Sequence, residues 1–175
     1  TGSGKSTLAY LIMRLLDPSN GNITVDNKRL DELNLDAWRA YMGYVPQEHF
    51  LFSDSILNNI LFGTKEDVSF ERVQEVAKNA GIHDSIMNFP EQYETRLGER
   101  GINLSGGQKQ RLSIARALIK TPDILVLDDC LSAVDNETEE LILQSIKSEL
   151  RSKTTLIISH RISSLKYADR IIVMD

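Results

Sequence analysis

The chain opens with Thr1-Gly2-Ser3-Gly4-Lys5-Ser6-Thr7, and this stretch decides the fold. It holds most of the phosphate-binding pattern G-x-x-x-x-G-K-[ST], with Gly4, Lys5 and Ser6 at the last three fixed positions. Glycine lets the backbone curl so that N–H groups point inward, and these groups, with the start of the next helix, can bind phosphate oxygens. We expect Lys5 to contact the β- and γ-phosphates and the Ser6 hydroxyl to bind Mg²⁺. The alternative is an ordinary glycine-rich turn before a helix.

A second informative stretch is a short apolar run that ends in a carboxylate, Ile124-Leu125-Val126-Leu127-Asp128. In phosphate-binding α/β proteins, an aspartate at the carboxyl end of such a strand holds Mg²⁺, which predicts this role for Asp128. Apolar strands ending in Asp are also common without a ligand. The stretch therefore supports nucleotide binding mainly in combination with residues 1–7.

Short apolar strands alternate with helices over the last third: strands at 124–127 and 155–158, and helices from 105 to about 120 and from 137 to 150. This alternation predicts a mostly parallel sheet that helices cover on both faces. Residues 21–30 predict a small antiparallel hairpin. From 53 to about 88 the pattern is helical without a strand. The predicted fold is an α/β P-loop NTPase with a small antiparallel β part and a helical subdomain insert.

The remaining boundaries follow from local signals. Pro18 ends the first helix, and Pro46 forces the residue before it into extended geometry. Gly63 and Gly81 are typical helix stops. We expect helices at 8–17, 36–42, 53–63 and 70–80, and strands at 43–45 and 170–175.

Composition and chain ends narrow the class of protein. The 175 residues carry a formal net charge of −5, which gives no general footprint for nucleic acid. The single cysteine, Cys130, excludes an internal disulfide. No apolar run approaches the roughly 18 residues that a membrane span needs. Because the chain starts inside a motif and ends in an open strand, we expect truncation at both ends.

The most specific stretch is Leu104-Ser105-Gly106-Gly107-Gln108. Ser105 can cap the helix that follows, and the two glycines expose the N–H groups of its first turn, which makes a second anion site. A capped helix after a loop is the alternative. Here the chain resembles the ATP-binding cassette (ABC) ATPases, and the resemblance covers essentially all 175 residues. Residues 104–108 match the family's signature motif.

The resemblance extends to further motifs and implies a domain layout. Gln47 matches the Q-loop glutamine, Ser132-Ala133-Val134-Asp135 matches the D-loop, and His160 matches the switch histidine. The implied RecA-like core comprises residues 1–52 and 104–175. Residues 53–103 would form the helical subdomain and a coupling loop.

The family's mechanism implies a role for each matching residue. Two cassettes pair head to tail, so that each ATP lies between the phosphate loop of one and the signature of the other. The implied Mg²⁺ ligands are Ser6, Gln47 and Asp128, and the implied catalytic residues are Asp129, His160 and Gln47. Asp135 would line the dimer interface. The implied nucleotide-binding residues are Thr1, Gly2, Ser3, Gly4, Lys5, Ser6 and Thr7 on one side, and Ser105, Gly106, Gly107 and Gln108 on the other.

Two segments resemble those of exporters. Residues 94–101 look like the loop before the signature that contacts coupling helices of a transmembrane domain, and residues 48–56 look like an exporter's segment after the Q-loop. The resemblance implies an exporter of the multidrug or lipid type at the cytoplasmic face of the cell membrane. A soluble ABC protein that acts on DNA or ribosomes is the alternative, but such proteins lack the 95–101 segment.

Asp129 departs from the family pattern, which usually has glutamate at this position as the base that polarises the attacking water. Aspartate is shorter by about 1.3 Å, and a misplacement of about 1 Å can lower a rate roughly 100-fold. We therefore expect the site on this chain's own phosphate loop to hydrolyse ATP slowly, as in one half of a heterodimeric exporter. The alternatives are a homodimeric exporter in which Asp129 works adequately, and a regulatory cassette that clamps ATP. We expect the isolated chain to be inactive.

Overall fold

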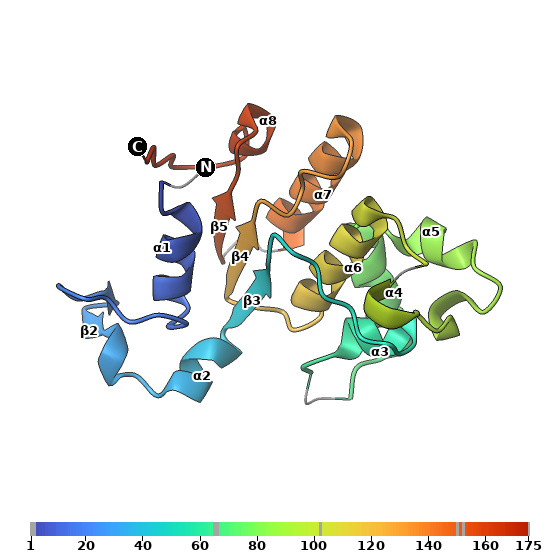
Figure 1. The fold of residues 1–175 in the computed structure, drawn as a ribbon, viewed down its shortest axis with the longest axis horizontal. Coiled ribbons are helices and arrows are strands. Elements are labelled where there is room, and N and C mark those ends of the chain that lie inside the picture. The colour runs from blue at the N-terminus through green and yellow to red at the C-terminus, as the bar shows by residue number, and fades with distance from the viewer. Residues whose placement is uncertain (1–2, 65–66, 102, 150, 152, 175) are drawn as a thin grey trace.

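The computed structural model describes residues 3–64, 67–101, 103–149, 151 and 153–174. Its centre is a parallel sheet of three strands in the order β3 (Met42–Val45), β4 (Ile124–Asp128) and β5 (Thr154–Ile158) (Figure 1). Leu127 pairs with Val45 on one side and with Ile157 on the other. Because the strands run in the same direction, the residues that follow each of them meet at one edge of the sheet.

Helices cover both faces of this sheet, because side chains of a strand alternate between faces. Leu125 and Leu127 of β4 belong to the larger core cluster, together with residues of α6 (Gly106–Leu118) and α7 (Asn136–Glu149). Val126 belongs to the second cluster, with Ala9 in α1 (Lys5–Ile12). Helices α1 and α6 therefore lie on opposite faces, as Figure 1 also shows. The expected α/β fold is confirmed.

The helical part contains α3 (Ile56–Leu61), α4 (Phe70–Asn79) and α5 (His83–Met87), followed by 3₁₀ turns at Gln92–Glu94 and Glu99–Gly101. Helix α3 begins at Ile56, three residues later than the expected start at residue 53, because the Ser55 hydroxyl caps it by accepting a hydrogen bond from the Asn58 N–H. Gly63 and Gly81 have φ of +86° and +66°, the left-handed conformation that ends helices.

The small antiparallel part is the hairpin of β1 (Thr24–Val25) and β2 (Lys28–Arg29). Asp26 and Asn27 both have positive φ, at 50° and 63°, as a tight two-residue hairpin turn requires. A 3₁₀ turn, Leu30–Glu32, leads to α2 (Leu35–Ala40). We expected this helix to extend to residue 42, but it ends at Ala40, because Met42 already pairs with Ile124 in the sheet.

Two expected boundaries are wrong. Helix α1 ends at Ile12 rather than Asp17, because Arg14 adopts φ +51° and Leu15 is 49% exposed. The expected strand at 170–175 is not formed over the described residues 170–174, which pair with none of the described strands. A strand needs a partner for its backbone groups, and the apolar pattern alone does not provide one. A short helix not anticipated from sequence, α8 (Ile162–Leu165), follows β5.

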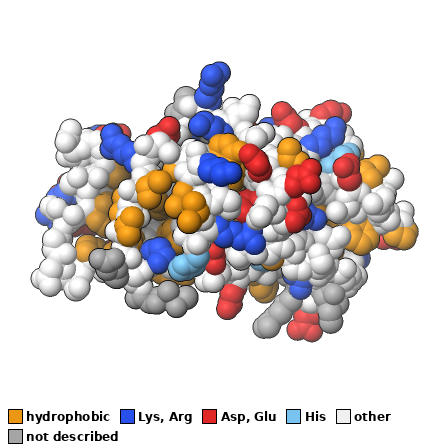
Figure 2. Space-filling model, turned by 90° about the horizontal axis from the view of Figure 1, so that it is seen from above, with side chains coloured by type: hydrophobic (Ala, Val, Ile, Leu, Met, Phe, Trp, Pro, Cys, Tyr) orange, Lys and Arg blue, Asp and Glu red, His pale blue; other side chains and the backbone are white. Residues whose placement is uncertain are grey.

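The surface carries charges of both signs. On the face in Figure 2, Lys and Arg side chains are interspersed with Asp and Glu rather than gathered into one basic area. Hydrophobic side chains on this face gather mainly in the left-hand half of the view, with a smaller group at the right-hand end. Over the described part of the chain, no helix combines the length and apolar character needed to cross a membrane.

Candidate nucleotide-binding site

The phosphate loop turns into α1 through Gly4, which has φ +82° and ψ +12°. A side chain at this position would be strained, so glycine is required for the turn. No described side chain caps α1, so its first backbone N–H groups are available to a ligand. Lys5 Nζ donates to Ser3 Oγ at 2.6 Å, which folds the ammonium back over the loop. Thr1 and Gly2 lie outside the described residues.

Ser6 of the phosphate loop and Asp128 at the end of β4 are in direct contact. Ser6 Oγ donates to Asp128 Oδ1 at 3.0 Å, although the residues are 122 positions apart. Asp128 ends β4 and is 2% exposed. A hydroxyl and a buried carboxylate side by side are hard oxygen ligands, which is the donor set that Mg²⁺ prefers. The residues present therefore fit a Mg²⁺ site.

Tyr44 in β3 is a neighbour of this pair that the sequence did not indicate. Burial raises the pKa of the Tyr44 hydroxyl, and nearby Tyr10 and Asp128 raise it further. The hydroxyl therefore stays protonated at neutral pH and adds no negative charge beside Asp128. The only sequence signal for this role was that Tyr44 carries a polar hydroxyl within a short apolar strand.

Two hydrogen bonds fix the backbone of Asp129. Its φ is +45°, in the left-handed region that Asp tolerates better than most residues. The Asp129 N–H donates to the Ile158 carbonyl at 2.8 Å, and its own carbonyl accepts from Ser132 Oγ at 3.0 Å. The backbone of Asp129 is thus fixed on both sides, so the length of its side chain limits how far the carboxylate reaches.

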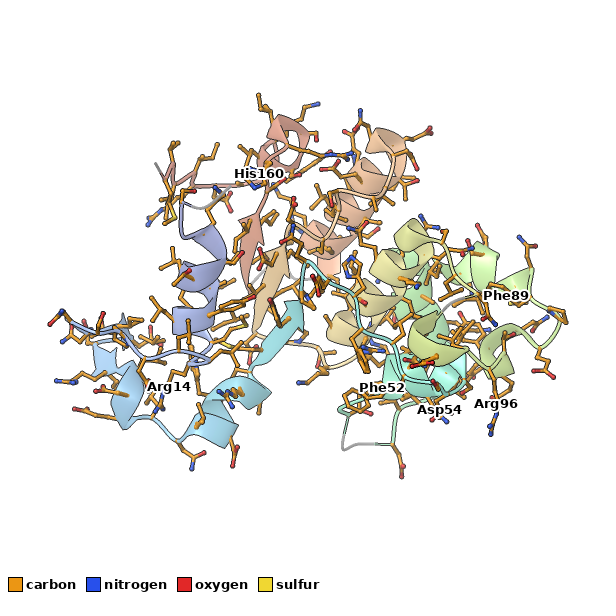
Figure 3. The ribbon with its side chains drawn as sticks, viewed as in Figure 1. Arg14, Phe52, Asp54, Phe89, Arg96 and His160 are labelled. Carbon is orange, nitrogen blue, oxygen red and sulfur yellow. The ribbon has the colours of Figure 1, made fainter. Side chains whose placement is uncertain are left out.

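The other two expected catalytic residues follow neighbouring strands. Gln47 lies two residues beyond β3 and His160 two residues beyond β5, and both are exposed. Figure 3 places His160 beyond the end of β5, close to α8. The structure brings Ser6 and Asp128 into contact, but no described hydrogen bond joins Gln47 or His160 to them.

The signature residues form the capped start of α6. Ser105 Oγ accepts from the Gln108 N–H at 3.2 Å, and Gln108 Oε1 accepts from the Ser105 N–H at 2.9 Å. This capping box confirms the expected cap and occupies the side-chain oxygen of Gln108. A Cβ on Gly107 would lie 3.1 Å from the Ala133 carbonyl oxygen, so the D-loop backbone packs directly against the signature turn.

The two exporter-like segments lie side by side. Leu97 N donates to the Asp54 carbonyl and Ile56 N donates to the Thr95 carbonyl, both at 3.0 Å. Figure 3 shows Asp54 and Arg96 next to each other. These two hydrogen bonds therefore join both segments at the start of α3.

A polar pair of the buried Asn59 and the half-buried Arg116 links the same region to α6, and the sequence did not indicate it. Arg116 donates to the carbonyls of Asn59 and Phe50 at 2.7 Å, and its guanidinium lies 5.6 Å from the centre of the Phe52 ring. Asn59 is fully buried and accepts from the Phe52 N–H at 2.9 Å. Burial lowers the pKa of Arg116 to about 10, so it remains charged at neutral pH.

Comparison with known proteins decides the family. A profile of ABC transporters matches residues 1–132. This chain belongs to the ABC transporter family. It is 50% identical over 175 residues to the "Uncharacterized ABC transporter ATP-binding protein YknU" of Bacillus subtilis, covering all of this chain and 30% of that protein.

Other relatives agree. The "Multidrug resistance-like ATP-binding protein MdlA" of Escherichia coli is 48% identical over 174 residues, which is 99% of this chain and 29% of that protein. A bacterial Atm1-family ABC exporter with ATP bound superimposes with a TM-score of 0.95 at 42% identity, over 100% of this chain and 31% of that one. This chain therefore spans about three tenths of the length of these three relatives.

Proposed function

We propose that this chain is the ATP-binding and ATP-hydrolysing part of an ABC exporter. The observation that carries the proposal is the 3.0 Å contact between Ser6 and Asp128, beside the turn that presents Lys5. A relative named as a multidrug resistance-like protein and a solved structure titled as an exporter support the exporter class.

Each residue has a role in this proposal. Lys5 and the N–H groups at the start of α1 bind the phosphates. Ser6, Gln47 and Asp128 hold Mg²⁺, which when bound offsets the negative charge of the phosphates. Asp129 accepts a proton from the attacking water, and His160 orients the γ-phosphate end of the substrate.

The second half of the proposal is that two cassettes share each nucleotide. Helices α1 and α6 start on opposite faces of one sheet, which argues against both helix ends contacting the same phosphate within one chain. Ser105, Gly106, Gly107 and Gln108 would instead act on the nucleotide of the partner cassette. A γ-phosphate held from both sides stabilises the closed pair, and its loss on hydrolysis favours opening.

The pairing is asymmetric in this proposal. The shorter Asp129 makes this chain's own site slow, while its intact signature completes an active site on a non-identical partner. A regulatory cassette that clamps ATP with little turnover is the second candidate, and Asp129 is the observation that favours it.

We place the helical subdomain, residues 53–103, against the transmembrane domain, at the cytoplasmic face of the cell membrane. The support is the backbone pairing of residues 54–56 with residues 95–97, which holds the two exporter-like segments together. The transmembrane domain would carry the substrate pathway.

Nucleotide binding by the full-length transporter tests the proposal. Lys5→Ala should weaken MgATP binding at this site about 10-fold or more, because a charge-assisted contact is lost. Lys28→Ala, on the exposed hairpin, is the matched control and should bind like wild type. Equal affinity of Lys5→Ala and Lys28→Ala would contradict the assignment.

A further inference from the structure

Arg161, directly after His160, forms hydrogen bonds with the loop of residues 131–134. Its guanidinium donates to four oxygens: the Leu131 carbonyl at 3.4 Å, the Val134 carbonyl at 3.1 Å, the Ser132 carbonyl at 3.2 Å and Glu139 Oε2 at 2.8 Å. Three of these oxygens belong to the loop 131–134, which runs from the β4 end toward α7. A planar guanidinium suits such a set, because it presents several donors in fixed directions.

Glu139 fixes the orientation of Arg161. Its side chain lies on α7 and is 1% exposed. Besides Arg161, its carboxylate accepts hydrogen bonds from the hydroxyls of Ser163 and Ser164. A carboxylate buried to this degree is stable only when it is paired and hydrogen-bonded. Arg161 is therefore held in place by α7 and α8, and it holds the loop in turn.

The same loop contacts the signature helix on its other side. The Ala133 N–H donates to Gln110 Oε1 at 3.2 Å, and Gln110 is 1% exposed within α6. The Ala133 carbonyl is the atom that a Cβ on Gly107 would approach to 3.1 Å. Residues 131–134 thus lie between Arg161 and the signature turn, with polar contacts or close packing on both sides.

We propose that Arg161 is a positioning residue that couples the two nucleotide sites to which this chain contributes. The inference depends on the proposed function, in which His160 serves the chain's own nucleotide and the signature turn serves the partner's. When the turn that carries His160 shifts, Arg161 moves the carbonyls of 131–134 with it, and the loop moves the signature turn. Arg161 itself contacts neither nucleotide.

The test is steady-state ATP hydrolysis by the full-length transporter carrying Arg161→Lys. Lysine keeps the positive charge beside Glu139 but has no planar fork for the loop carbonyls. We expect kcat to fall about 10-fold, because misplacement of the signature turn by a fraction of an ångström is costly. The KM for ATP and the unfolding midpoint should stay close to wild type. Arg151→Lys, at an exposed position, is the matched control.

A double-mutant cycle with Gly107→Ala separates coupling from a merely structural role. If Arg161 acts through the loop on the signature turn, the double variant should lose no more kcat than the more impaired single variant. Three results would each overturn the inference. The first is a double variant whose loss of kcat is the product of the two single losses. The second is a kcat for Arg161→Lys within about 2-fold of wild type, and the third is a kcat loss that follows a lowered unfolding midpoint. A wild-type transporter without ATP hydrolysis would refute the proposed function itself, so the two failures are distinguishable.

Discussion

Lengthening Asp129 by one methylene should activate the site on this chain's own phosphate loop. The Asp129 backbone is fixed by the 2.8 Å hydrogen bond to Ile158 and by the Ser132 hydroxyl, so Asp129→Glu lengthens the side chain from an unchanged backbone position. The gain in reach is about 1.3 Å. A correction of this size is worth up to roughly 100-fold in rate, or about 2.7 kcal/mol of activation free energy. The side chain is only half-buried, so the longer residue has room.

The assay must isolate this site, because a fast partner site would hide the change. We would measure single-turnover hydrolysis of γ-labelled ATP in the assembled full-length transporter, with the partner's phosphate loop disabled. Asp129→Asn has the same length without the charge and should lose the residual turnover. Asp123→Glu, at an exposed position just before the start of β4 and therefore at the opposite end of the strand, is the surface control. A change of less than about 2-fold for Asp129→Glu would refute the reasoning from reach.

Three further predictions test neighbouring parts of the site. Gly107→Ala should lower turnover at the partner's nucleotide about 10-fold and more than Gly106→Ala, whose Cβ would lie 4.0 Å from its nearest neighbour rather than 3.1 Å; equal losses would contradict this. Asp128→Asn should lower MgATP turnover about 100-fold, and a Mg²⁺ titration of the rate would show an unchanged requirement if the assignment is wrong. Asn59→Ala should lower the unfolding free energy by about 3 kcal/mol, because the Phe52 N–H and one Nη of Arg116 both lose Asn59 Oδ1 as acceptor in a buried setting. For a domain of this size that corresponds to roughly 6–12 °C in the Tm of the domain's unfolding transition, and no shift would contradict it.

The sequence predicted the parts of the fold that depend on local pattern. Alternation and apolar runs located β3, β4 and β5 and the helices α4, α6 and α7 to within a few residues. The motifs assigned Ser6 and Asp128 to one Mg²⁺ site; their side chains are in contact at 3.0 Å, and the Mg²⁺ role stays a prediction. The capping role of Ser105 was readable because its partner, Gln108, lies three residues away.

Features that depend on distant partners were not readable. The apolar pattern of residues 170–174 suggested a strand, but strand formation depends on a neighbour that no local signal provides. Leu15 continued the helical spacing of α1, yet the left-handed Arg14 ends the helix earlier. The pair of Arg161 and Glu139 joins residues 22 positions apart, and nothing in either local sequence marks it.

The central claim is that each nucleotide lies between the phosphate loop of one cassette and the signature turn of the other. The most direct measurement is a structure of the full-length transporter with ATP and Mg²⁺ bound at both sites, in a variant that does not hydrolyse ATP. We predict that Ser105 Oγ and the Gly107 N–H lie within hydrogen-bonding distance, roughly 3 Å, of the γ-phosphate on the partner's phosphate loop. A closed, ATP-bound complex in which Ser105 is remote from both triphosphates would contradict the account.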